Sequence, residues 1–233
     1  MKQLLLATIA FLLLINTTVS GQVREDGISY CFHCEPIPKN DWGLIFQNTF
    51  SRKFNEKLKG EINLQSRIMD RFTTLKALML EPGIKFKLHK YFAFKSAVRY
   101  TLAPSQYSFG HSFRLHLAGY FVWHKEGIPF RIQYRTRVEK EDYFFWRNRI
   151  KIAFNIKQVL KPYSSFEIFN QSSNRGFLDL FRYEGGIKWE MHELCNITFM
   201  YRLESSYGGN LPGKSQVLGL MINYSLSPRK QST

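Results

Sequence analysis

Two neighbouring stretches of the sequence decide the fold: residues 113–123 read FRLHLAGYFVW, and residues 130–138 read FRIQYRTRV. In both, apolar or aromatic residues alternate with polar or charged ones, so the period is close to two residues rather than 3.6. Because successive side chains of a β-strand point to opposite faces, each stretch predicts a strand with one apolar face and one cationic face.

The same alternation recurs along most of the chain after Trp42. Most of these runs are about 9–13 residues long, whereas soluble strands usually have about 5–6 residues and tilted transmembrane strands about 9–11. The runs therefore predict an all-β protein, a transmembrane antiparallel up-and-down barrel. We expect strands at residues 42–52, 58–69, 76–88, 92–102, 112–124, 128–139, 146–156, 162–170, 181–189, 194–204 and 215–226.

The connections and the tryptophans also favour a membrane barrel. The predicted connections alternate between turns of about three to five residues and loops of about six to ten, as the two rims of transmembrane barrels do. Trp42 and Trp146 open strands at the long-loop rim, and Trp123 and Trp189 close strands at the short-turn rim. Indole settles where hydrocarbon meets headgroups, so these four residues predict two aromatic girdles.

The composition excludes several classes of protein. With 44% apolar and 16% aromatic residues in 233, the chain has too much to bury for a disordered protein. Three Cys are too few for a disulfide framework. The formal net charge is +15, but cations at every second residue of a strand do not form the accessible basic surface that nucleic acid requires. We expect no nucleic-acid partner.

The cost of exposing charge to lipid decides which face of each strand points outward. An Arg or Lys that faces lipid at mid-membrane costs about 2–4 kcal/mol, so the charged face is expected to line the lumen. Like charges on paired strands repel, so the basic wall should either reach carboxylates or hold anions. The predicted basic wall is Arg114, Arg131, Arg135, Arg137, Arg147, Arg149 and Lys151, and the predicted acidic partners are Glu61, Glu81, Glu167, Glu184 and Glu204.

The first residues have the pattern of an export signal. Lys2 supplies the positive start, Leu4–Ile15 an apolar run too short to span a bilayer, and Val19–Gly21 a small-residue exit. Cleavage is expected near residues 20–22. The predicted organisation is a signal peptide at 1–21, an N-terminal periplasmic segment or short strand at 22–41, the barrel at 42–226 and a C-terminal tail at 227–233.

Eleven runs conflict with the even strand count of single-chain bacterial barrels. Either a short strand near Ile28–Phe32 makes twelve, or one run is not a transmembrane strand and the count is ten. The weakest run is 162–170, which begins at a proline. Between ten and twelve strands, twelve is preferred.

Several short motifs in a fixed order resemble the family DUF2490. They are Trp146 to Ile150, Pro162-Tyr163 followed by Glu167 and Phe169, Arg182 with Gly185 to Lys188, Tyr201-Arg202, and the Trp42-Gly43 opening. The resemblance covers about residues 40–226. It implies a bacterial outer-membrane β-barrel, and the family has no established activity or catalytic residues to transfer.

Two further motifs concern assembly and the N-terminal segment. Gly219, Ile222 and Tyr224 resemble the terminal-strand signal read by the barrel assembly machinery, although Val217 stands where that signal is polar and nine residues follow Tyr224. Cys31 and Cys34 have redox-like spacing but lack a thioredoxin context and a second ligand pair for zinc. We expect a local disulfide there, and neither metal nor cofactor.

An enzyme is the less favoured class. Outer-membrane hydrolases need a nucleophile with a His base and a carboxylate in reach. His111 and Ser112 are adjacent, so they point to opposite faces of a strand, and no carboxylate is implied beside them.

The sequence predicts a non-enzymatic protein of the Gram-negative outer membrane. Its Arg/Lys-lined lumen is either plugged by side chains or forms a narrow, porin-like, anion-preferring pore. The expected partners are outer-membrane lipid and lipopolysaccharide, the barrel assembly machinery during insertion, and a small anion. The alternatives are an exported soluble barrel that binds an apolar ligand and an outer-membrane hydrolase.

Overall fold

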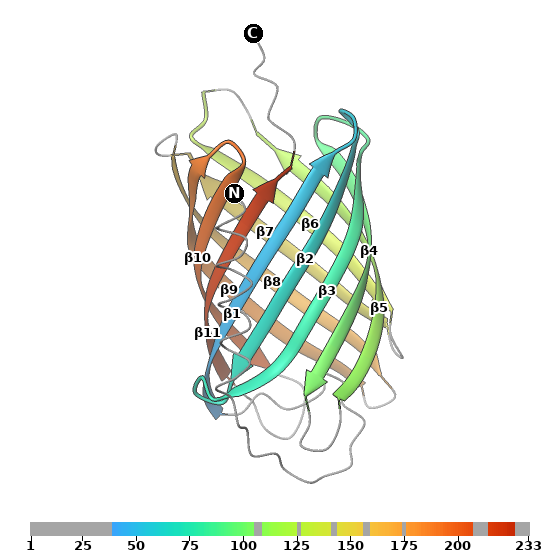
Figure 1. The fold of residues 1–233 in the computed structure, drawn as a ribbon, viewed down its shortest axis with the longest axis vertical. Coiled ribbons are helices and arrows are strands. Elements are labelled where there is room, and N and C mark those ends of the chain that lie inside the picture. Colours follow the sequence, from blue (N-terminus) through green and yellow to red (C-terminus); the bar gives the residue numbers. More distant parts are fainter. Residues whose placement is uncertain are drawn as a thin grey trace.

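The computed structural model describes residues 39–104, 109–124, 127–140, 144–155, 159–173, 176–206 and 214–226. These residues form one closed barrel of strongly tilted strands (Figure 1). Its strands are β1 Lys39–Lys53, β2 Leu58–Met69, β3 Thr74–Lys87, β4 Phe92–Pro104, β5 Phe109–Trp123, β6 Phe130–Lys140, β7 Phe144–Phe154, β8 Leu160–Ser173, β9 Gly176–His192, β10 Cys195–Ser206 and β11 Lys214–Ser225.

The barrel has eleven strands in the described part of the chain, so the preference for twelve, and the alternative of ten, are wrong. Sequential strands pair antiparallel, whereas β1 and β11 close the barrel as a parallel pair from Lys39↔Lys214 to Ser51↔Ser225. An odd number of alternating strands leaves the first and last running in the same direction, and a parallel ladder satisfies both edges. Ile28–Phe32 and the two cysteines of the expected disulfide lie outside the described residues.

The strands match the predicted runs but extend further at one rim. The connections 54–57, 88–91, 124–129, 155–159 and 193–194 lie at the upper rim of Figure 1, and 70–73, 105–108, 141–143, 174–175 and 207–213 lie at the lower rim. The predicted difference in loop length is not observed. The reason is that hairpins continue pairing at the lower rim, as Ser173↔Gly176 shows for β8 and β9.

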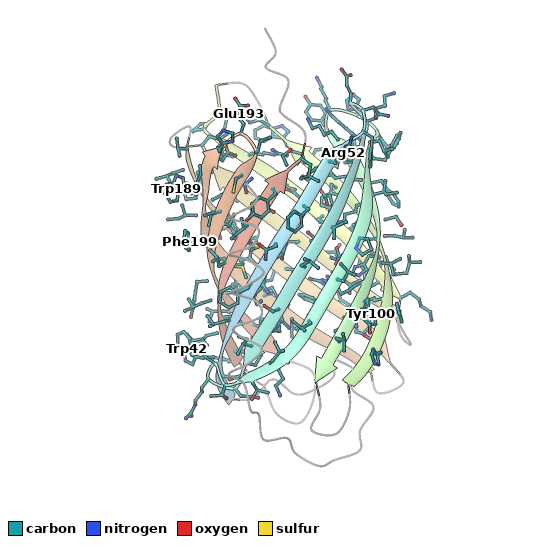
Figure 2. The ribbon with its side chains drawn as sticks, viewed as in Figure 1. Trp42, Arg52, Tyr100, Trp189, Glu193 and Phe199 are labelled. Carbon is teal, nitrogen blue, oxygen red and sulfur yellow. The ribbon has the colours of Figure 1, made fainter. Side chains whose placement is uncertain are left out.

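The two faces of the sheet are divided as the alternation predicts. Large apolar side chains such as Phe113, Leu115 and Leu117 of β5 are exposed on the outside, while Arg114 and His116 between them are buried inside. Figure 2 shows Trp42, Trp189 and Phe199 projecting outward from the wall. The barrel therefore carries an apolar exterior and a charged interior.

The outward band between the rims is free of formal charge in the described strands. On β7, for example, the outward positions from Trp146 to Phe154 hold Trp, Asn, Ile, Ile and Phe. Outward charges occur only near strand ends, as at Arg52, Lys76 and Lys140. The residues described include no helix that is both long and apolar enough to cross a membrane.

Two adjacent glycines of β9 give a test of interior packing. A Cβ on Gly186 would overlap the carbonyl oxygen of Phe199 and lie 2.9 Å from the Tyr163 ring, whereas a Cβ on Gly185 meets only the Tyr163 carbonyl oxygen at 3.9 Å. We expect Gly186→Ala to lower the free energy of unfolding by about 1–3 kcal/mol through overpacking, and Gly185→Ala to leave it nearly unchanged. Urea titrations of both variants measure this difference, and equal effects would contradict the close approach of Phe199 and Tyr163 to Gly186.

Candidate functional site

The candidate site is the charged interior of the barrel. Arg114 of β5, Arg135 and Arg137 of β6, and Arg147 of β7 are buried side chains that project into it. Their strands pair so that Arg135 faces Arg149 and Arg137 faces Arg147. Like charges are thus adjacent on neighbouring strands, which is unfavourable unless carboxylates lie between them.

Glu139 and Glu81 supply the first two of these carboxylates. Glu139 is fully buried and lies 2.7 Å from Arg147, 2.8 Å from Arg137 and 3.0 Å from Arg114. Glu81, on β3, lies 2.6 Å from Arg99 and 3.3 Å from Arg137. Arg137 therefore bridges the two carboxylates across the lumen, a geometry that its planar, forked guanidinium suits.

Glu167 of β8 is the centre of the network. It pairs with Arg135, with Arg147 at 3.2 Å and with Arg182 of β9 at 3.1 Å. Three guanidinium groups from three strands thus share one carboxylate. A buried charge is tolerated only when it is paired and hydrogen-bonded, and Glu167 meets that condition with cations on its own strand's two neighbours and beyond.

Glu204 and Glu184 carry the network to the far wall. Arg182 lies 2.7 Å from Glu204 of β10, and Arg202 lies 3.5 Å from Glu204 and 2.7 Å from Glu184. Arg67 of β2 reaches the same Glu204 at 3.4 Å, across β1 and β11. The ion pairs therefore run from carboxylate to carboxylate around the interior and end by spanning the closing pair of strands.

His116 is enclosed within this network. Its Nε2 lies 3.8 Å from Glu81, its Nδ1 lies 3.7 Å from Glu139, and Arg137 contacts its Nε2 at 3.0 Å. The aromatic rings of Phe145 and Phe169 cover the guanidinium groups of Arg114, Arg147 and Arg182 at 4.1–4.8 Å. Cation–π contacts of this kind stabilise the arginines and fill the space between them.

Three of the predicted basic residues stand apart from the network. Arg131, Arg149 and Lys151 project into the same lumen, but no carboxylate of the described chain lies within ion-pair distance of them. Lys151 instead lies over the ring of Tyr163, 3.3 Å from its centroid. Glu61, the remaining predicted partner, is paired with Lys59 at 2.9 Å and with Lys95 at 3.1 Å.

Two hollows follow this division of charge. A central cavity of about 660 Å³ extends from Lys53 and Glu193 at the upper rim down to Arg67 and Arg114 in the network. A second hollow of about 840 Å³ lies at the upper rim, and Arg131, Lys151, Tyr91 and Tyr163 are among its lining residues. Below them the interior is tightly filled, with Glu139 and Val217 having no exposed surface.

The remaining predicted residues lie on the wall of the barrel. Trp42 and Trp146 lie near the lower rim, and Trp123 and Trp189 near the upper rim. Gly219, Ile222 and Tyr224 lie on β11, where Tyr224 stacks on Phe50 with ring centroids 5.1 Å apart. His111 is exposed on the outside, and its Nδ1 forms a hydrogen bond of 2.5 Å with the Tyr100 hydroxyl, while Ser112 points to the opposite face.

Sequence reasoning missed several members of the network. Glu139, which pairs with three arginines, was not among the expected acidic partners, and neither Arg67 nor His116 was assigned a role. Strand alternation places Glu139 inward, two residues after Arg137, so that signal was available. The described residues contain no group of three or more His, Cys, Asp or Glu that could hold a metal ion.

The comparisons with known proteins agree with the sequence motifs. The model of the family described as "Protein of unknown function (DUF2490)" matches residues 42–210, which include β1 to β10. No curated protein and no solved structure matches the chain. Because the match covers most of the sequence, this chain is a member of the DUF2490 family.

Proposed function

We propose that this protein is a non-enzymatic outer-membrane β-barrel whose lumen is plugged by its own arginine–carboxylate network. The observation that carries the proposal is the bridged series of ion pairs through Glu81, Glu139, Glu167 and Glu204, which crosses the interior below the central cavity. A barrel with this few strands has a narrow interior that long side chains can fill.

The exterior supports the membrane location. About eleven strand residues at roughly 3.3 Å each, tilted by about 45°, span about 25 Å, the height of the apolar band of outer-membrane barrels. The uncharged outward band of this barrel has that length on strands such as β2 and β10. In water it would expose a large continuous apolar surface, which soluble monomers avoid.

The interior argues against both alternatives. An exported soluble barrel that holds an apolar ligand needs an apolar cavity, but both hollows are lined largely by Lys, Arg and Glu. A hydrolase needs a nucleophile beside a His base, and the buried His116 faces carboxylates and an arginine instead. The export signal and the +15 net charge are compatible with a mature protein in contact with acidic lipids and lipopolysaccharide.

Planar-bilayer recording tests the plug. We expect the folded, heat-modifiable protein to produce no steady ohmic conductance, because side chains occupy the lumen at the network. A general porin inserted under the same conditions controls for membrane quality. Anion-selective steps that disappear in Arg135→Gln and Arg149→Gln would contradict the plug and assign a pore instead.

A further inference from the structure

The upper end of the lumen has an excess of positive charge. Its two inward carboxylates are each already shared by two lysines: Glu61 by Lys59 and Lys95, and Glu190 by Lys161 and Lys188. The cations that remain are Lys85, Arg131 and Lys151, on β3, β6 and β7.

These three cations are close to one another and have no carboxylate partner among the described residues. The charge of Arg131 acts on both Lys85 and Lys151, so Arg131 lies between them electrostatically. Lys85 lies over the Tyr120 ring at 4.4 Å and Lys151 over the Tyr163 ring at 3.3 Å. Ring faces therefore hold the two ammonium groups where the network holds its cations with carboxylates.

The hollow beside these residues is large enough for a small molecule and is reached from the upper rim. It has a volume of about 840 Å³, and Arg131 and Lys151 line it together with Tyr91 and Tyr163. An adjoining hollow of about 300 Å³ is lined by Lys85 and again by Arg131. Arg131 thus stands at the boundary of two adjoining spaces.

We propose that this upper end of the lumen binds a small multivalent oxyanion, of the pyrophosphate or tricarboxylate class, between Lys85, Arg131 and Lys151. Three like charges held at one end of a protein-lined space repel one another, and a multivalent anion removes that repulsion. Arg131 supplies the planar fork that binds a phosphate or carboxylate through two parallel hydrogen bonds, and the lysines act as point charges. The tyrosine faces provide an apolar border.

The site is separate from the plug. Arg131 and Lys151 belong to no ion pair of the network, so their substitution leaves no buried carboxylate unpaired. A barrel with either residue replaced is therefore expected to fold, and loss of binding would not reflect loss of structure.

Titration calorimetry with inorganic pyrophosphate tests the proposal on the full-length mature protein in phosphatidylcholine nanodiscs. Each charged hydrogen bond lost is expected to weaken binding about tenfold, so Arg131→Gln should raise the Kd about tenfold and the double variant with Lys151→Gln about a hundredfold. Arg52→Gln is the matched control, because Arg52 lies at the same rim on the outer side of the wall (Figure 2). Its Kd should equal that of the wild type.

Three results would each be informative. No binding by the wild type at millimolar pyrophosphate overturns the site while leaving the plug intact, since the conductance measurement is independent. An equal loss in Arg52→Gln and Arg131→Gln also overturns it, because the attraction would then be diffuse. Repetition in nanodiscs that contain phosphatidylglycerol identifies the source of the oxyanion: weaker pyrophosphate binding there assigns a competing lipid headgroup, and unchanged binding assigns a free anion.

Discussion

Glu167→Gln is expected to be the most destabilising single substitution in the lumen. The change keeps the volume of the side chain but removes the charge shared by Arg135, Arg147 and Arg182. Removing one partner of a buried ion pair leaves uncompensated charge and typically costs about 3–5 kcal/mol, and here three guanidinium groups lose it together. Urea unfolding in phospholipid vesicles, followed by tryptophan fluorescence, measures the loss.

Glu190→Gln is the matched control for this prediction. Glu190 also accepts two cations, Lys161 and Lys188, both at 2.7 Å, but all three side chains are partly exposed to solvent. Exposed pairs contribute about 0–1 kcal/mol, so the control should change the free energy of unfolding little. Equal losses in the two variants would show that the network does not hold the barrel together. The double variant Glu167→Gln, Arg147→Gln should lose less than the sum of its single variants, because it also removes an orphaned cation.

Local sequence pattern was sufficient to predict the wall of the barrel. The alternation of Phe113 to Trp123 with Arg114, His116 and Ala118 predicts a strand and also its two faces, because a slip of one residue would turn every cation toward the outside. All eleven predicted runs correspond to strands of the structure. The preference for twelve strands is wrong because the general rule of even counts does not hold for this barrel, whereas the runs themselves do.

The contacts inside the lumen could be predicted only where they are local. Glu167 and Arg149 are cross-strand partners in the β7–β8 hairpin, so a carboxylate beside the basic wall could be expected. Arg67 and Glu204 are 137 residues apart, and they meet only because the parallel β1–β11 pair closes the barrel at one particular register. No hairpin fixes that register, and therefore no local signal predicts the contact.

The lower rim illustrates a similar limit. Pro162 makes the eighth run look weak, yet β8 extends from Leu160 to Ser173 and pairs along its whole length with β9. A proline at the start of a strand lacks a donor that the ladder does not require there, so it does not weaken the strand. The polar residues 171–173 predict a loop, because alternation fades where a hairpin extends beyond the apolar band.

The medium that surrounds the barrel can be tested with one strand. Ile150 and Phe154 both face outward on β7, and both are well exposed, but Ile150 lies near the middle of the band and Phe154 at its upper edge. In a bilayer, Ile150→Arg should lower the free energy of unfolding by about 2–4 kcal/mol and Phe154→Arg by about 0–1 kcal/mol, because the cost of a lipid-facing cation depends on its depth. In water both substitutions would stay within about 0.5 kcal/mol of the wild type, as surface changes usually do. Urea titrations of the two variants in vesicles therefore separate the environments, since only hydrocarbon makes two similarly exposed positions on one strand differ; similar small losses at both would refute the membrane location while leaving the ion-pair network untouched.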